Sequence, residues 1–312
     1  MYITKVAHYI PENSIKNDYF TSRLDITNEW IVERTGILER RRASAKENTH
    51  TMGIRAIENL PEGYPLDDID LIIGATYTPA DTIVTLAHKI QHYLKIPDIP
   101  TLTITAACSS FVNACEIVEG YFAMGKATKA LVIASEHNSR YSNDEDPKTG
   151  PLWGDGAVAT ILTKTKESNS LQVISIKTAG AATTGKAMYG VCLDPKQGLT
   201  MPNGKDVFIQ ACQKMSSITL DILSQNGYNL NDLDYLVPHQ ANKRITNKLR
   251  TTLGLNDSSC LSNIEYLGNT GSAGSVIALS EHMDKYDDGC LIVIPVFGGG
   301  YSYGALLLKK VL

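Results

Sequence analysis

The chain contains two copies of one short segment, separated by about half its length. Glu62–Ile73 reads EGYPLDDIDLII and Asn226–Val237 reads NGYNLNDLDYLV, with five identical residues at a single offset of 164 positions. Two weaker pairs of similar segments follow in the same order: Leu131–Ala134 with Leu291–Ile294, and Gly156–Val158 with Gly304–Leu306. This period is far longer than that of a solenoid repeat. The sequence therefore indicates two related halves, which we place at residues 1–165 and 166–312.

Each half alternates short apolar runs with amphipathic segments, which is the pattern of an α/β fold. We expect strands at Met1–Ile10, Asp70–Ala75, Thr101–Thr105, Ala130–Ala134, Ala157–Leu162 and Leu291–Val296. We expect helices between Thr27, a suitable N-cap, and Gly36, and over Thr51–Leu60 and Thr82–Leu94. Because the strands are almost continuously apolar, they predict a mixed sheet covered by helices on both faces.

The stretch from Thr101 to Ile117, TLTITAACSSFVNACEI, passes from a strand to a helix with almost no loop. We expect Thr101–Thr105 to be buried and the helix to begin near Phe111. Cys108 then lies at a helix N-terminus, where free N–H groups and the helix dipole favour a thiolate. The alternative is that Cys108 is a small buried apolar residue, as most free cysteines are.

The repeat gives Cys108 two partners. It aligns His239 with Ala75 and Asn269 with Cys108, each just past an equivalent strand. Ligands of α/β sheets bind at the carboxyl ends of strands, so we expect Cys108, His239 and Asn269 to converge on one pocket. A histidine there can act as a base or a hydrogen-bond donor. The alternative is a histidine satisfied by backbone groups and a plain glycine-rich turn at Gly268–Gly274.

Composition excludes several classes of protein. The chain is 43% hydrophobic and 20% charged with a net charge of −4, which argues against general nucleic-acid binding. Its six cysteines form no CxxC pair, so we expect neither a metal site nor a disulfide framework. The longest apolar runs are too short for membrane insertion, and Met1–Ile10 reads as a strand rather than a signal peptide. We expect a cytoplasmic protein.

Six segments occur in a family-specific order: EWIVERTGILERR, AACSSF, GDGA, VPHQANKRI, LGNTGSAGS and VFGGGYSYGA. Together they resemble β-ketoacyl-[acyl-carrier-protein] synthase III, a condensing enzyme of the thiolase superfamily. The resemblance implies a thiolase-like, duplicated five-layer α-β-α-β-α fold with two pseudo-equivalent halves. It also implies a homodimer whose partners are acyl-CoA and an acyl carrier protein, with no metal or other cofactor.

The resemblance assigns roles to single residues. Cys108 matches the nucleophile, His239 and Asn269 match the other two catalytic residues, and the N–H groups of Cys108 and Gly299 match an oxyanion hole. Substrate contacts are implied for a further set, with Trp30 and Arg34 at the adenine end of CoA, Asn242 at the pantetheine arm and Arg244 at a phosphate. Carrier-protein docking is expected at Lys243, Arg244 and Lys248, although a solvated helix face explains Lys248 equally well.

The implied reaction is decarboxylative condensation of an acyl-CoA primer with malonyl-[acyl-carrier-protein], which initiates fatty-acid or polyketide-type synthesis. The alternatives are transfer of the acyl group to another acceptor without elongation, a non-catalytic partner subunit, and a cysteine hydrolase. The chain departs from the common pattern in reading AACSSF for AACAGF and GNTGSAGS for GNTSAAS. Pro147 replaces an arginine that contacts adenine, and Ile83 replaces a phenylalanine at the acyl pocket. The acyl group, its carrier and the pathway therefore stay open.

Overall fold

We describe the protein from a computed structural model, which describes residues 1–194 and 196–312. In this part of the chain nine strands form one mixed sheet, in the order β11-β12-β13-β8-β1-β7-β6-β4-β5. The strands are β1 Tyr2–Tyr9, β4 Leu71–Ala75, β5 Thr101–Ile104, β6 Lys129–His137, β7 Asp155–Thr163, β8 Ser170–Gly180, β11 Tyr235–Leu236, β12 Leu291–Gly298 and β13 Ser302–Val311. Two small hairpins accompany the sheet: β2 Asn13–Lys16 with β3 Glu39–Arg42, and β9 Cys192–Asp194 with β10 Gly198–Thr200.

The two halves of the sheet have the same strand topology, as the repeated sequence segments predict. The first half has the spatial order β5-β4-β6-β7-β1. The second half has the equivalent order, because Cys260 bridges Leu236 in parallel beyond β11 and takes the place of β5. Antiparallel pairing of β1 with β8, at Tyr2 opposite Gln172, joins the two halves. The boundary that we place after residue 165 falls between β7 and β8 and stays a prediction.

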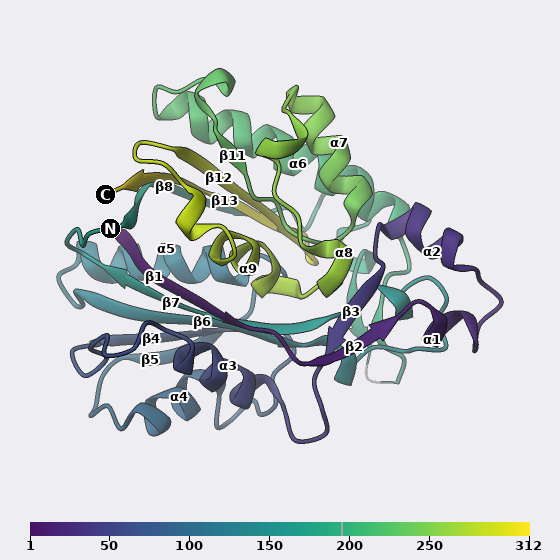
Figure 1. Cartoon of the computed structure of the whole chain (residues 1–312), viewed down its shortest axis with the longest axis horizontal. Helices are drawn as coiled ribbons and strands as arrows, with labels where there is room; N and C mark the ends of the chain where they lie inside the picture. Colours follow the sequence, from purple (N-terminus) through teal and green to yellow (C-terminus); the bar gives the residue numbers. More distant parts are fainter. Residues whose placement is uncertain (195) are drawn as a thin grey trace.

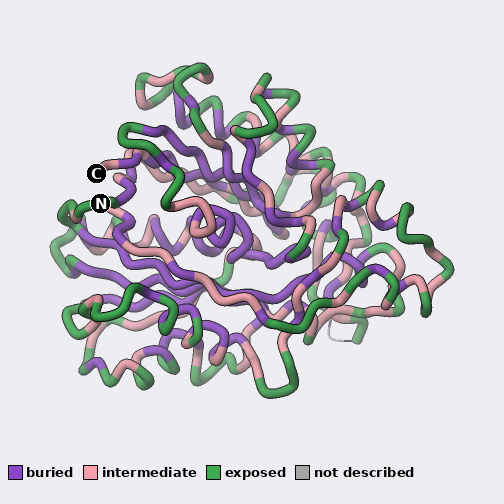
Figure 2. Tube along the Cα trace, in the orientation of Figure 1, coloured by how far each residue is buried: buried purple, intermediate pink, exposed green. Residues whose placement is uncertain are grey.

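Helices complete five layers (Figure 1). The central pair is α5 Ser110–Ala123 and α9 Gly274–Ser280, and the outer helices are α3 Thr49–Glu58 and α4 Leu86–Leu94 on one side and α6 Gly204–Gln225 and α7 Lys243–Leu253 on the other. Helix α5 contacts β4 and β6 of the first half and also β8 and β13 of the second. Strands β4, β6, β7 and β12 and helix α9 are almost wholly buried (Figure 2). The expected α-β-α-β-α architecture is confirmed.

Two helix boundaries illustrate local capping. Helix α2 (Asn28–Thr35) begins and ends where expected: Thr27 accepts a hydrogen bond from the Trp30 N–H, and Gly36 has a φ of +74°. Helix α4 begins at Leu86, so our prediction of a helix from Thr82 is wrong. The carboxylate of Asp81 accepts hydrogen bonds from the N–H groups of Ile83 and Val84, which hold this segment in a turn.

Strand β5 also differs from expectation. We expect a buried strand, but all four of its residues are half-buried. The strand is less buried than expected because it is the last strand of the sheet and pairs only with β4. An edge strand of this kind leaves one row of backbone N–H and C=O groups without a partner strand.

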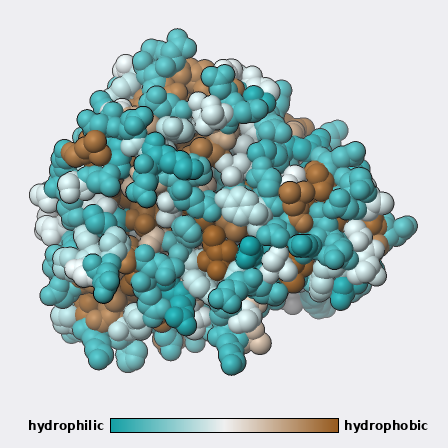
Figure 3. All heavy atoms as spheres, viewed as in Figure 1, coloured by the Kyte–Doolittle hydropathy of each residue, from teal (hydrophilic) through white to brown (hydrophobic). Residues whose placement is uncertain are grey.

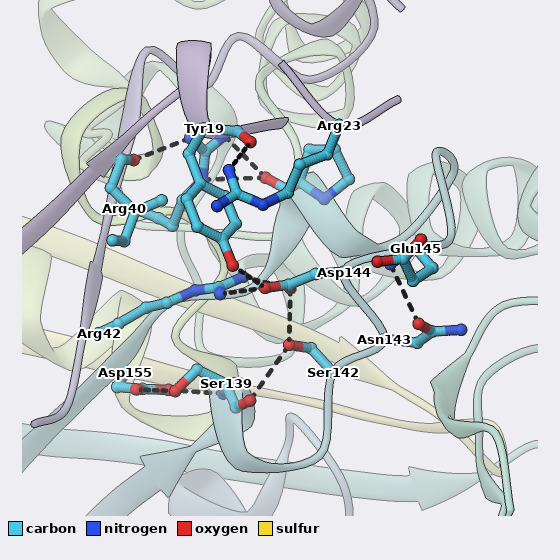
Figure 4. Close-up of polar contacts among 12 residues, drawn as sticks. Tyr19, Arg23, Arg40, Arg42, Ser139, Ser142, Asn143, Asp144, Glu145 and Asp155 are labelled. Carbon is cyan, nitrogen blue, oxygen red and sulfur yellow. Dashed lines mark hydrogen bonds and ion pairs between the residues drawn. The ribbon is translucent and has the colours of Figure 1, made fainter. Parts of the chain in front are cut away.

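A polar network fastens the hairpin β2–β3 and α1 (Asp18–Thr21) to the loop before β7 (Figure 4). The Arg42 guanidinium donates two hydrogen bonds to the Asp144 carboxylate, at 2.7 and 2.8 Å. The Tyr19 hydroxyl donates a third at 2.9 Å. Partial burial acts to raise the pKa of the Asp144 carboxyl, but the hydrogen bonds and the charge of Arg42 outweigh it and lower the pKa overall. The Asp144 carboxylate and the Arg42 guanidinium are therefore both charged and form an ion pair.

The outer surface is ordinary for a globular chain. On the face shown in Figure 3, apolar side chains form separate groups within a mainly hydrophilic surface. None of the helices in residues 1–194 and 196–312 combines the length and the apolar character that a membrane crossing requires.

Candidate active site

The turn between β5 and α5 is strained and tightly held. Ala107 has a φ of +51°, which is unfavourable for a residue with a Cβ atom. Two serines hold the turn on either side. The Ser110 hydroxyl accepts a hydrogen bond from the Ala106 N–H at 2.8 Å and donates to the Ala107 carbonyl at 2.6 Å. The Ser109 hydroxyl donates to the Ala106 carbonyl and contacts the Ser302 hydroxyl. The unusual Ser109-Ser110 pair thus stabilises the conformation that presents Cys108.

Cys108 lines a pocket of about 160 Å³. Its walls come from separate parts of the chain, among them Tyr77, Ala107, Trp153, Leu199 and Gly299. The end of β12 packs directly against the turn that carries Cys108, since a Cβ atom on Gly298 would lie 2.6 Å from the Cys108 nitrogen. Glycine is therefore required at position 298. This close approach places Cys108 and Gly299 on one pocket, as an oxyanion hole built from their N–H groups needs.

His239 lies just past β11, and its backbone N–H donates to the Pro295 carbonyl of β12 at 2.9 Å. The residue is only 3% exposed, and its Nδ1 atom is buried with no hydrogen-bond partner in the described part of the chain. Burial lowers the pKa of His239 to about 4, so the imidazole is neutral near pH 7.

Asn269 lies in the turn that leads to α9, and backbone contacts fix it. Its N–H donates to the Leu152 carbonyl at 2.8 Å, and its carbonyl accepts from the Gly154 N–H at 3.0 Å. The side-chain Oδ1 accepts from the Gly271 N–H at 2.9 Å. With Oδ1 engaged, the amide nitrogen is the group that can donate to a ligand. Asn269 also forms a β-bridge with Trp153, one of the pocket residues.

Asn263 links the His239 and Asn269 loops. Its backbone N–H donates to the Gln240 side chain, and its amide donates to the Gly274 carbonyl, both at 3.1 Å. Contacts from β12, Trp153 and Asn263 therefore gather the three expected catalytic turns at one end of the sheet. The joint action of the three side chains stays a prediction.

The protonation state of Cys108 differs from our expectation. Burial, assisted by the nearby Glu136 carboxylate, raises the pKa of Cys108 to about 12. The Tyr77 hydroxyl and the residue's own N–H act in the opposite direction but do not offset burial. Our expectation that the helix N-terminus favours a thiolate is therefore wrong for the free protein, because desolvation of the sulfur dominates. The raised pKa makes Cys108 a neutral thiol in the free protein near pH 7.

Sequence reasoning missed two groups beside the sulfur. The Tyr77 hydroxyl lies against Cys108, buried and without a hydrogen bond of standard geometry in the described residues. Glu136 ends the apolar part of β6 and accepts hydrogen bonds from the hydroxyls of Thr76, Thr78 and Ser272 and from the Tyr77 N–H. Burial raises the pKa of Glu136 to about 7. The signal for Glu136 was a single carboxylate at the end of an apolar run.

The residues expected to bind CoA lie where α2 meets α7. The Arg34 guanidinium stacks 4.2 Å from the centre of the Trp30 ring. The Asn242 amide donates to the Arg34 carbonyl and accepts from the Arg244 N–H, each at 2.8 Å. Asn242 therefore caps α7 and fastens it to α2. These four residues are brought together, and their contact with CoA stays a prediction.

The three basic residues expected to dock a carrier protein lie along α7 but differ in exposure and in ion pairing. Lys243 forms an ion pair with Glu265, and a Cβ atom on Gly36 would clash with its stem at 2.3 Å. Arg244 and Lys248 are exposed. Arg244 also lies 5.5 Å from the Phe208 ring, which holds its guanidinium near the start of α6.

Fold and site together define a thiolase-type α/β protein with a cysteine presented at a strand-to-helix turn. The family model for 3-oxoacyl-[acyl-carrier-protein] synthase III matches residues 102–180, and the model for its C-terminal part matches residues 223–310. The chain belongs to the 3-oxoacyl-[acyl-carrier-protein] synthase III family.

Individual members of this family align with almost the whole chain. The chain is 33% identical to β-ketoacyl-[acyl-carrier-protein] synthase III of Clostridium perfringens, with 96% of each chain covered. It is 34% identical to the Oceanobacillus iheyensis protein of the same name, with 98% of each covered. Among solved structures, 3-oxoacyl-[acyl-carrier-protein] synthase III from Aquifex aeolicus superposes with a TM-score of 0.92 at 31% identity, covering 99% of both chains.

Proposed function

We propose that the protein condenses an acyl-CoA primer with malonyl-[acyl-carrier-protein], releasing carbon dioxide and forming a 3-oxoacyl-[acyl-carrier-protein]. In this role it initiates fatty-acid or related polyketide-type synthesis. The observation that carries the proposal is the strained turn that presents Cys108 to a pocket shared with Gly299. A non-catalytic subunit has no need to maintain such a turn.

The first half-reaction transfers the acyl group to Cys108. The sulfur attacks the thioester carbonyl while the thiol proton passes to neutral His239, which returns it to the departing CoA sulfur. The N–H groups of Cys108 and Gly299 stabilise the tetrahedral oxyanion. Loss of one such donor typically lowers the rate by about 10²–10³-fold.

The second half-reaction forms the carbon–carbon bond. The malonyl thioester loses carbon dioxide, and His239 and Asn269 donate hydrogen bonds to the enolate oxygen that results. The enolate carbon attacks the acyl carbonyl, the bond to Cys108 breaks, and the sulfur takes a proton from solvent. The cycle needs no metal or cofactor, because departing carbon dioxide drives it and side-chain donors stabilise the charge.

The proposal includes the substrate contacts. Trp30 and Arg34 hold the adenine end of CoA, Asn242 the pantetheine arm, and Arg244 a phosphate. Arg244 and Lys248, exposed on α7, meet the acidic carrier protein together with Lys243. The ion pair of Lys243 with Glu265 would have to open or be shared in that complex.

We also propose a homodimer in the cytoplasm. Strand β5 has a free edge, and the neighbouring loop exposes 83% of Ile83 and 44% of Val84. A second copy that pairs with this edge would cover both features. The six cysteines are all free thiols, which suits a reducing compartment.

Intact-mass spectrometry after incubation with short acyl-CoAs tests the first half-reaction. We expect an acyl adduct on the wild-type protein and none on Cys108→Ala. With malonyl-[acyl-carrier-protein] added, release of carbon dioxide is expected to require both His239 and Asn269, and to fall at least ~10²-fold in His239→Ala or Asn269→Ala. An adduct that transfers to an acceptor with no release of carbon dioxide would favour transfer without elongation. The absence of any adduct would reject the proposal.

A further inference from the structure

The Tyr77 ring stands at one wall of the pocket that Cys108 lines. Tyr77 follows β4, and parallel pairing of β4 with β5 brings it beside the nucleophile turn. Its hydroxyl lies against Cys108 on one side. On the other side it fills the space beside Gly271, where a Cβ atom would lie 2.4 Å from the Tyr77 oxygen. The ring therefore occupies the gap between the nucleophile and the Asn269 turn.

The backbone at Tyr77 is held firmly. Its N–H donates to the buried Glu136 carboxylate at 3.3 Å, and both neighbouring threonines bind the same carboxylate. Gly271 has a φ of +59° and follows directly on the turn that Asn269 forms. Its lack of a side chain is what leaves room for the phenol. The ring is thus packed between its own anchored backbone and the Gly271 turn.

The space left beside Cys108 is small. The pocket measures about 160 Å³, and its remaining walls include Trp153, Val191, Leu193 and Leu199, all apolar. An apolar cavity of ~150 Å³ accommodates a molecule the size of benzene. An acyl group of about six carbon atoms therefore fills this volume.

We propose that Tyr77 determines the length of the acyl group that Cys108 accepts, limiting donors to short acyl chains. This inference rests on the proposed function, because it concerns the acyl group transferred to the same sulfur. The limit comes from the volume of the ring and not from the hydroxyl. Shortening the side chain at position 77 extends the pocket toward Gly271 and admits longer donors.

A graded series of variants tests the inference by intact-mass measurement of the Cys108 adduct. The donors are acetyl-, butyryl-, hexanoyl-, octanoyl- and dodecanoyl-CoA at equal concentration, and the variants are Tyr77→Phe, Tyr77→Leu and Tyr77→Ala. We expect wild type and Tyr77→Phe to react at least tenfold faster with butyryl- than with dodecanoyl-CoA. This ratio is expected to fall progressively in Tyr77→Leu and Tyr77→Ala.

The outcomes separate the two proposals. Absence of adducts with every donor in the wild type would reject the proposed function itself. Adducts in the wild type with no dependence on chain length, or a length preference unchanged in Tyr77→Leu and Tyr77→Ala, would overturn only the role of Tyr77. A shift as large in Tyr77→Phe as in Tyr77→Ala would assign the effect to the hydroxyl and also overturn it. Tyr77→Leu retains most of the packing, so the test survives if Tyr77→Ala fails to fold.

Discussion

At the scale of single residues, burial determines the chemistry of the site. Cys108 and His239 are both neutral in the free protein, since desolvation raises the pKa of the thiol and lowers that of the imidazole. A neutral thiol in a small, mainly apolar pocket resists oxidation and metal capture better than a thiolate does. Under the proposed mechanism, the reactive charge arises only once a thioester lies beside Cys108.

Glu136 gives a prediction about pH at the same scale. Its pKa is raised from 4.5 to about 7, so the folded state binds a proton that the unfolded state has released. The proton bound by Glu136 stabilises the folded state fully below the pKa of this carboxyl in the unfolded chain. This stabilisation is lost as pH rises through about 7. We therefore expect the melting temperature of Glu136→Gln, relative to wild type, to increase by several degrees between about pH 5 and pH 8.

Calorimetry across this pH range measures the effect, and the exposed Glu145→Gln serves as the matched control. The amide introduced by Glu136→Gln loses some of the carboxylate's hydrogen bonds at every pH, so the slope with pH is the informative quantity and not the absolute difference. A difference between Glu136→Gln and wild type that stays constant with pH would contradict a raised pKa.

At the scale of elements, helix ends hold in place the residues that we propose to bind CoA. The first turn of α2 carries Trp30, whose N–H donates to the Thr27 hydroxyl at 3.1 Å. The last turn carries Arg34, whose carbonyl accepts from Asn242 at the start of α7. Two short helices are thus fixed to each other by capping groups. Neither helix has to be stable alone, because each end is bound to the other element.

The cap of α2 gives the second prediction. Thr27→Ala removes the acceptor of the Trp30 N–H and is expected to lower the free energy of unfolding by about 1 kcal/mol. Because the loosened turn carries Trp30, we expect weaker binding of acyl-CoA, with the rate of the bound complex unchanged. Titration calorimetry and denaturant unfolding measure the two effects. Thr27→Ser keeps the hydroxyl and should behave as wild type; equal weakening in both variants would disprove the capping role.

At the scale of the whole molecule, duplication produces the site. Two halves with one strand order are joined by β1 and β8, and α5 and α9 pack between them. The turns before α5 and α9 therefore carry Cys108 and Asn269 at equivalent places. Segments outside the repeat, such as the hairpin β2–β3, are then attached to this frame by polar contacts.

The Arg42–Asp144 pair tests how firmly that attachment holds. Asp144→Ala leaves the Arg42 guanidinium, only 10% exposed, without its carboxylate. We expect a loss of about 2–3 kcal/mol in the free energy of unfolding. The exposed ion pair of Arg55 with Glu58 is the matched control, and Glu58→Ala is expected to lose less than ~1 kcal/mol. Urea unfolding of both variants gives the comparison, and equal losses would show that burial of Arg42 has no special effect.

The amino-acid sequence alone predicts the α/β class, the duplication, the cap and stop of α2, and the strand-end positions of Cys108, His239 and Asn269. These features depend on local periodicity, on turn residues and on repeated segments, all of which are readable along the chain. Three features follow only from the folded arrangement: Cys108 is a neutral thiol, Glu136 accepts hydrogen bonds from three hydroxyls, and Tyr77 forms a wall of the pocket. Each depends on desolvation or close packing by residues far apart in sequence. Neither the dielectric around a sulfur nor the volume beside it is a local property of the chain.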